Sequence, residues 1–165
     1  MDGTINSGGT IGDRDRDFLS ECALAQMRKV KRFELIEHTA DTGLKAYGKD
    51  LKEVFANAAF GMFSIIAELD EIKETESRRI EVSEDNLENL LFEWLNDMLY
   101  FMDVENLIFK RFDIIELSDN HLVAECWGEK YDPSRHRVKT GIKSATYHML
   151  SVDKEKNEIQ VIFDV

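Results

Sequence analysis

Apolar residues recur at spacings of three and four in two stretches of the sequence, a period typical of amphipathic helices. The first stretch follows Asp50, which has Glu53 three residues later, a combination typical of a helix N-terminus. The second follows Asp85 and Glu88 in the same arrangement. Each predicted helix has one wide apolar face and one charged face, so each must pack against another layer. The apolar positions are Leu51, Val54, Phe55, Ala58, Ala59, Met62, Phe63 and Ile66, then Leu87, Leu90, Leu91, Trp94, Leu95, Met98 and Leu99.

Shorter runs that alternate between apolar and polar residues predict strands. The turn signals Ser118-Asp119-Asn120 and Lys154 to Asn157 join several of these runs in the second half of the chain, which favours an antiparallel meander. The fold class predicted is α+β, a two-layer sandwich with two amphipathic helices packed on a mostly antiparallel or mixed β-sheet. The predicted strands are 32–38, 43–48, 78–83, 107–117, 121–129, 142–152 and 158–165.

The first 26 residues differ from the rest, because they are rich in Gly, Asp and Arg and lack long apolar periodicity. We expect 1–26 to be a disordered or non-native leader, Met27 to be the natural start, and 27–165 to form a single domain. No signal-peptide pattern follows Met1. No segment reaches the roughly 20 apolar residues that a membrane-spanning helix needs.

The chain is acidic, with 33 Asp and Glu against 21 Lys and Arg and a formal net charge of -12. That balance disfavours tight, direct binding to nucleic acid, because phosphates would be repelled. The basic exceptions are Lys110-Arg111 and the run from Arg135 to Lys143, so action on RNA would require a more basic partner. Cys22 and Cys126 lie far apart and predict no disulfide framework, which indicates a reduced, cytoplasmic protein.

Two carboxylates stand out by their positions. Asp41 lies in the turn HTADTG, between two predicted strands, and Asp164 closes the final apolar strand IQVIFDV next to the α-carboxylate of Val165. If that strand end meets the turn, three anionic oxygen groups converge, and a hard divalent cation would hold them together. The alternative is a fraying terminus with a solvated Asp164. Spacing alone leaves both open.

Other catalytic signatures are absent from the sequence. His38, His121, His136 and His148 form no HExxH or other paired spacing, so a zinc hydrolase is unsupported. No nucleophile elbow, phosphate-binding loop or dinucleotide fingerprint occurs. Residues 128–150 are polar and basic up to Lys143 and then alternate, so they either bind an anion or acidic protein surface or form a solvated loop.

Four blocks of sequence together resemble the archease family, over about Phe33 to Val165. They are HTADTGLKAYGKDLKEVFANAAFGMF, LLFEWLNDMLYFMD, GEKYD followed by RHRVKTGIKSATYHML, and the terminal IFDV. The resemblance implies a two-layer α/β fold and a non-catalytic partner of the RtcB-type RNA ligase of tRNA splicing. Such a partner promotes guanylylation of the ligase and its multiple turnover, without joining RNA itself.

The resemblance also implies a metal site, formed by Asp41, Asp164 and Val165, with calcium as the expected ion and Lys143 as a functional contact. Thr42 replaces the Ile common in the family, which is a small change. Two other functions remain open. A metal-dependent hydrolase or phosphotransferase would turn over phosphoesters, and a general chaperone-like module would suppress the aggregation of unrelated proteins.

Overall fold

The computed structural model describes residues 31–37 and 41–165. Residues Arg32–Val165 form one compact unit. The predictions made for the leader 1–26, for Met27 as the start and for Cys22 lie outside the described residues.

Helix α2 spans Leu51–Ile66 and begins as the sequence predicts. The side chain of Asp50 accepts a hydrogen bond from the Glu53 N–H at 2.9 Å, and Glu53 accepts one from the Lys49 N–H at 3.0 Å. These bonds satisfy N–H groups that a helix leaves free at its start. Of the eight predicted apolar positions, only Leu51 is half-buried, and the others lie in the core.

Helix α3 spans Leu87–Glu105, and its seven predicted apolar residues are all buried. Its N-cap is Asn86, not Asp85 as the sequence suggested, with the Asn86 side chain accepting from the Asn89 N–H at 2.8 Å. Asn and Asp cap helices equally well, so local preference leaves the register open. Starting after Asn86 makes Leu87, which is 6% exposed, the first helical residue and buries it in the core.

The described strands divide between two antiparallel sheets. The five-stranded sheet has the order β1-β2-β8-β6, with β7 also pairing with β8, and the three-stranded sheet has the order β3-β5-β4. The strands are β1 Phe33–Glu37, β2 Thr42–Tyr47, β3 Glu76–Ser83, β4 Leu107–Leu117, β5 His121–Lys130, β6 Ser144–Ala145, β7 Ser151–Asp153 and β8 Glu158–Asp164. The α+β class is confirmed, while the division into two sheets is a feature that the sequence pattern did not indicate.

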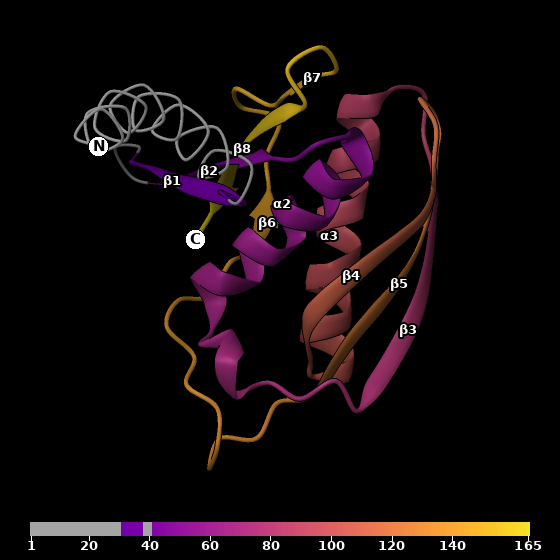
Figure 1. The fold of residues 1–165 in the computed structure, drawn as a ribbon. Helices are drawn as coiled ribbons and strands as arrows, with labels where there is room; N and C mark the ends of the chain where they lie inside the picture. Colours follow the sequence, from indigo (N-terminus) through magenta and orange to yellow (C-terminus); the bar gives the residue numbers. More distant parts are fainter. Residues whose placement is uncertain (1–30, 38–40) are drawn as a thin grey trace, which may run out of the picture. The chain divides into compact units, whose positions relative to one another are not determined.

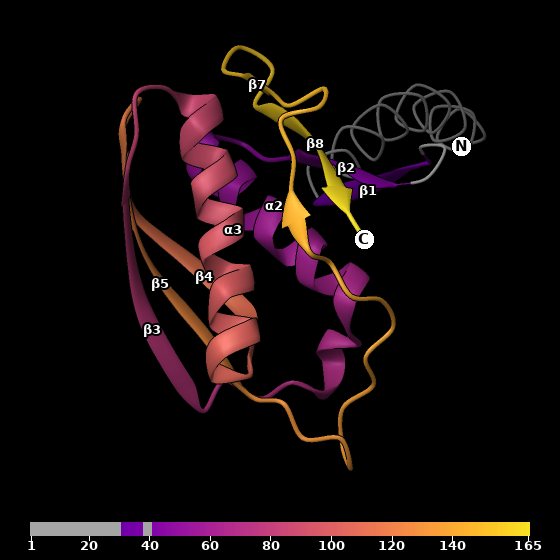
Figure 2. The same cartoon turned by 180° about the vertical axis from the view of Figure 1, so that it is seen from behind.

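The two helices connect the two sheets through a shared core. Helix α2 contacts β4 of the three-stranded sheet and β2 of the five-stranded sheet, and α3 contacts β3, β5 and β6. In Figures 1 and 2 the three-stranded sheet lies along one side of the helices, away from β2 and β8. Buried Trp94 of α3 donates its indole N–H to the Phe55 carbonyl of α2 at 3.0 Å, so its polar atom is satisfied inside the core.

The predicted strand 142–152 is wrong as a continuous element. The structure has two short strands there, β6 and β7, which both pair with β8 and are separated by a turn that contains Met149 with φ +56°. A long side chain in the left-handed region interrupts strand geometry. His148, which the sequence placed in a strand, therefore lies exposed in this turn.

Among the residues that the structure describes, no helix is long and apolar enough to cross a membrane. Cys126 is a free, buried thiol whose pKa is raised, first by burial and then by Glu125 and Asp113. Such a thiol is unreactive at neutral pH.

Candidate functional site

The pairing of β2 with β8 brings the two singled-out aspartates to neighbouring positions. Thr42 pairs with Phe163, and antiparallel register then sets Asp41 opposite Asp164 as the next position outward. Asp41 is half-buried and Asp164 is exposed. This register follows from the apolar pattern, because a slip by one residue would turn buried Val161 and Phe163 away from the core.

The other side of Asp164 faces the segment that carries Lys143. Ser144 of β6 pairs with Asp164, and the Lys143 N–H donates to the Asp164 carbonyl at 2.8 Å. Val165 follows directly and is 38% exposed, so its α-carboxylate lies at the same end of β8. We call Asp41, Lys143, Asp164 and Val165 the terminal edge. The four residues proposed from the sequence thus lie at one end of β8, with Asp41 on one side of the strand and Lys143 on the other.

Close packing beside the terminal edge restricts Gly43. A Cβ atom at this position would lie 2.6 Å from Cδ1 of Ile162 and 3.4 Å from the Val161 carbonyl oxygen. A larger residue would therefore press on β8 just before the Asp164 position. Because the tight contact is with the flexible end of the Ile162 side chain, packing of the β2–β8 pair favours Gly43 but does not require it.

The donor atoms at the terminal edge suit a hard cation in type. Asp41 and Asp164 form no salt bridge with any described residue. In residues 31–37 and 41–165, no group of three or more His, Cys, Asp or Glu side chains could hold a metal ion. Asp41 and Asp164 are only two carboxylates, so a metal site at this edge would also need the α-carboxylate of Val165. Calcium takes six to eight oxygen ligands, so water would complete such a site.

The loop 131–143, which leads to Lys143, is anchored by a buried polar cluster that sequence reasoning missed. Glu129 at the end of β5 accepts hydrogen bonds from Arg135 at 2.5 Å and from the Lys73 N–H at 2.7 Å. Nε2 of His136 lies 2.9 Å from Glu129, and Nδ1 of His136 accepts from the Asp132 N–H at 2.8 Å. The imidazole is therefore neutral, with its proton on Nε2.

The same cluster sets the charge of Glu129. Burial alone would raise its pKa, but hydrogen bonds from Arg135, the Lys73 N–H and His136 together lower the pKa to about 2. Glu129 is 7% exposed and His136 is 5% exposed, so a carboxylate and an imidazole are both enclosed here. The sequence offers no distinct local signal for this cluster, because β5 also carries His121, Glu125 and Lys130.

A second anchor of the loop 131–143 is the C-terminal end of α2. The N–H groups of Lys139 and Thr140 approach the Ile66 carbonyl oxygen at 2.6 Å and 3.4 Å, and Val138 bridges to Ala67. The last carbonyl groups of a helix have no N–H partners within the helix. Here the loop 131–143, from a distant part of the chain, provides the N–H donors. Lys143 therefore follows a loop held at both ends.

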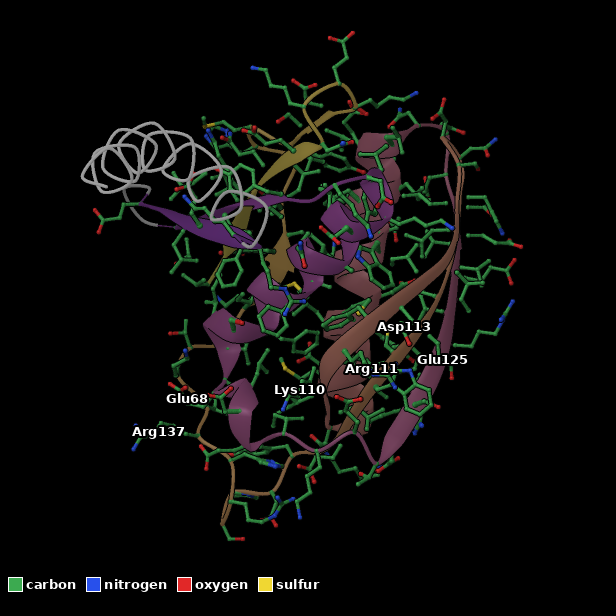
Figure 3. All side chains as sticks on the ribbon, viewed as in Figure 1. Glu68, Lys110, Arg111, Asp113, Glu125 and Arg137 are labelled. Carbon is green, nitrogen blue, oxygen red and sulfur yellow. The ribbon has the colours of Figure 1, made fainter. Side chains whose placement is uncertain are left out.

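Three of the six basic residues that the sequence singled out, Arg111, Arg135 and Lys139, form ion pairs with acidic side chains. Arg111 pairs with Glu74 at 2.6 Å and with Asp113 at 2.5 Å, and Lys110 donates to the Ile72 carbonyl at 3.1 Å. Arg111 and Asp113 lie together on β4 in Figure 3. The local basic patch that could have attracted phosphates is therefore weakened at this place.

In the loop, Arg135 pairs with Glu129 and Asp132, and Lys139 pairs with Glu68 at 3.6 Å. Figure 3 shows Arg137 extending outward near Glu68. Within the described part of the chain, the side chain of Lys143 has neither an ion pair nor a hydrogen bond. The unpaired ammonium of Lys143 thus belongs to the segment that runs along the end of β8.

Comparison with known proteins gives a family match over most of the chain. The model of the Archease protein family matches residues 33–165. A protein archease of Sulfurisphaera tokodaii is 35% identical over 138 residues, which are 82% of this chain and 99% of the relative. A protein archease of Saccharolobus islandicus is 42% identical over 137 residues, with the same coverage.

Two solved structures share the fold. The solution structure of Protein 1598 from Methanobacterium thermoautotrophicum superposes with a TM-score of 0.67 at 33% identity, covering 81% of this chain and 98% of that protein. A crystal structure from Thermotoga maritima, described as an archease and possible chaperone, superposes at 0.52 with 23% identity, covering 80% and 96%. On the family match and these relatives, the chain belongs to the Archease protein family.

Proposed function

We propose that this chain is a non-catalytic activator of an RtcB-type RNA ligase, and that it promotes guanylylation of the ligase and repeated turnover during tRNA splicing. The observation that carries the proposal is the terminal edge, where the pairing of β2 and β6 with β8 brings Asp41, Lys143, Asp164 and Val165 to one end of a sheet. The hydroxyl–histidine pair of Ser83 and His121, 2.9 Å apart, lies on β3 and β5 of the other sheet, and among the described residues no such pair is found at the terminal edge.

In this proposal a divalent cation, with calcium expected, is held by Asp41, Asp164 and the terminal carboxylate. The cation supplies charge neutralisation, which lets three anionic groups share one end of β8. Lys143 is the group that contacts the ligase or its bound nucleotide, because a free ammonium recognises phosphate or carboxylate oxygens. The chain itself carries net charge -12, so we assign RNA binding to the ligase.

A guanylylation assay of the cognate ligase tests the proposal. With GTP and the metal that the ligase requires, the chain at substoichiometric amounts should raise the rate of ligase–GMP formation and allow many ligation events per ligase. Asp41→Ala and Lys143→Ala should each reduce this stimulation at least tenfold. Asp119→Ala is the matched control, because Asp119 is exposed in the β4–β5 turn and pairs only with Lys154.

Stimulation at the wild-type rate by Asp41→Ala would overturn the role of the terminal edge. Turnover of phosphoesters by the purified chain with divalent metals would instead favour a hydrolase or phosphotransferase. The Thermotoga maritima relative is described as a possible chaperone. Suppression of aggregation of unrelated proteins, without any effect on the ligase, would support that function here.

A further inference from the structure

Strand β6 lies at the end of the five-stranded sheet and consists only of Ser144 and Ala145. Among the described strands it pairs with β8 alone, and its other side faces α3. Figure 2 shows β6 between α3 and β8. A strand this short, below the usual length, forms few hydrogen bonds within its sheet. Contacts with α3 must therefore help to hold it.

Asn96 of α3 makes such a contact with the backbone of β6. Its side-chain oxygen accepts a hydrogen bond from the Ala145 N–H at 2.9 Å. Successive N–H groups of a strand point to opposite sides, and the next one, of Thr146, donates to the Ile162 carbonyl of β8 at 3.0 Å. Ala145 is only 2% exposed, so Asn96 satisfies an N–H on the free side of β6 that water hardly reaches.

The same face of α3 also holds the segment that follows β6. Phe92 lies one helical turn before Asn96, and its ring stacks on that of Tyr147 with centroids 4.0 Å apart and planes at 11°. Ring stacking tolerates offset arrangements, whereas a hydrogen bond requires the donor to point at its acceptor. Asn96 is therefore the contact that fixes the backbone of β6 relative to the helix.

The backbone that Asn96 fixes leads directly to the terminal edge. Lys143 precedes β6, and its N–H donates to the Asp164 carbonyl at 2.8 Å, while Ser144 pairs with Asp164. Ala145 is two residues from Lys143, which is roughly 7 Å along an extended chain. A shift of Ala145 would therefore move Lys143 along the end of β8.

We propose that Asn96 is a positioning residue of the terminal edge, which holds β6 against β8 and so sets the place from which Lys143 contacts the ligase. This inference rests on the proposed function. Asn96 contacts neither the ligase nor the cation, and it acts only through Lys143. A purely structural role, in which Asn96 only satisfies a buried N–H, would instead lower stability without any dependence on Lys143.

Two substitutions at Asn96 form the test pair. Leucine has a similar shape but no acceptor, so Asn96→Leu leaves the Ala145 N–H without its partner. Aspartate, whether ionised or protonated, keeps an oxygen that accepts this N–H, so Asn96→Asp should behave like the wild type. Asn89→Leu is the matched control, because half-buried Asn89 lies two helical turns earlier and its side chain forms no hydrogen bond with any described residue.

Hydrogen exchange of the Ala145 amide, followed by NMR in the absence of ligase, measures the contact itself. In Asn96→Leu this amide should exchange at least tenfold faster than in the wild type, because its acceptor is gone. The Asn96→Asp and Asn89→Leu variants should keep the wild-type rate of exchange. An unchanged rate in Asn96→Leu would overturn the inference, since Asn96 would then not hold β6.

Guanylylation of the ligase separates positioning from stability. At saturating concentration and below the melting temperature of every variant, Asn96→Leu should lower the stimulated rate at least fivefold, and Asn96→Asp should restore it. In a chain that already carries Lys143→Ala, Asn96→Leu should cause no further loss, because a residue that acts through Lys143 has no effect without it. A further loss in that background would overturn the inference and leave Asn96 a structural role.

The assay also distinguishes failure of this inference from failure of the proposed function. Stimulation by Asn96→Leu at the wild-type rate would overturn the inference alone. Failure of the wild-type chain to stimulate the ligase would overturn the proposed function, and the inference with it.

Discussion

The groups around a buried or half-buried carboxylate, more than its residue type, set its pKa. Burial raises the pKa of Asp97 to about 6, and nearby Glu93 and Glu84 add to the effect. Burial acts in the same direction on Glu129, but three hydrogen bonds outweigh it and lower that pKa to about 2. One acidic side chain is therefore destabilising when ionised, while the other is stabilising.

We expect Asp97→Asn to stabilise the protein above pH 6. The folded pKa of Asp97 is raised from the ordinary 3.8 to about 6, so wild-type stability falls as the pH rises through this window. Because Asp97 is only half-buried, solvent screening reduces the effect to about 1 kcal/mol. Urea unfolding at pH 4 and pH 7.5 measures it, and an equal difference between the two proteins at both pH values would contradict the assignment.

We expect Asp41→Asn to weaken the binding of calcium at least tenfold, because one anionic ligand is lost from the terminal edge. Titration calorimetry with the metal alone measures the affinity, independently of any ligase. Asp119→Asn, which removes an equal charge from the β4–β5 turn, should bind like the wild type. Equal loss in both variants would mean that only the overall charge matters.

At the scale of elements, two features hold segments in conformations that the local sequence does not predict. The Glu129 cluster and the end of α2 together hold the loop 131–143 in place. Because Gly128 has no side chain, β5 can lie close to β4 at this position. The register of the two strands shifts beside it, between Phe109 and Arg111. Each feature leads to a prediction.

We expect Gly128→Ala to destabilise the protein by roughly 3 kcal/mol or more, as severe core strain does. An added Cβ would lie 1.9 Å from the Ile108 carbonyl oxygen and 2.7 Å from Cα of Phe109, and these are backbone atoms that cannot rotate away. Gly141→Ala is the control, because a Cβ there meets nothing within 4 Å. Thermal unfolding compares the two variants. Similar melting temperatures of Gly128→Ala and Gly141→Ala would show that the Cβ at position 128 does not clash with β4.

Glu129→Gln should loosen the loop 131–143. A neutral amide loses the charge-assisted hydrogen bond with Arg135 and turns a donor toward groups that already donate. Trypsin should then cleave after Arg137 and Lys139 faster than in the wild type, which limited proteolysis with mass spectrometry detects. The Glu116→Gln variant serves for comparison, since Glu116 is exposed on β4. Cleavage rates equal to the wild type would show that the cluster does not hold the loop.

At the scale of the whole molecule, the candidate site depends on the pairing of the start of β2 with the end of β8 more than on any single residue. The net charge of -12, and the pairing of Arg111, Arg135 and Lys139 with acids, leave Lys143 as an available cation beside the terminal edge. Such a surface suits contact with a more basic protein.

A tag fused after Val165 should weaken calcium binding and activation of the ligase together. The added peptide bond removes the terminal carboxylate, which is the third anionic group of the proposed metal site. Calorimetry and the guanylylation assay measure the two effects, and the same tag fused before Met1 controls for bulk. Full metal affinity with a C-terminal tag would show that Val165 is not a ligand.

The sequence by itself determined the helices, most of the strands and the choice of site residues. Spacings of three and four located the buried faces of α2 and α3 because burial requires an apolar stripe. Position in the sequence singled out Asp41, Asp164 and Val165, and the family resemblance supported this choice and added Lys143. Whether they hold calcium and contact a ligase remains a prediction.

Only the tertiary structure decided what depends on distant contacts. The division into two sheets, the turn at Met149 that interrupts 142–152 and the start of α3 after Asn86 all follow from packing between segments far apart in the chain. The Glu129–His136 cluster had no clear local pattern, because its stability comes from hydrogen bonds that the fold assembles. The local spacing of apolar residues shows which face of a helix or strand is buried. The residues that pack against this face come from distant parts of the chain, so only the fold determines them.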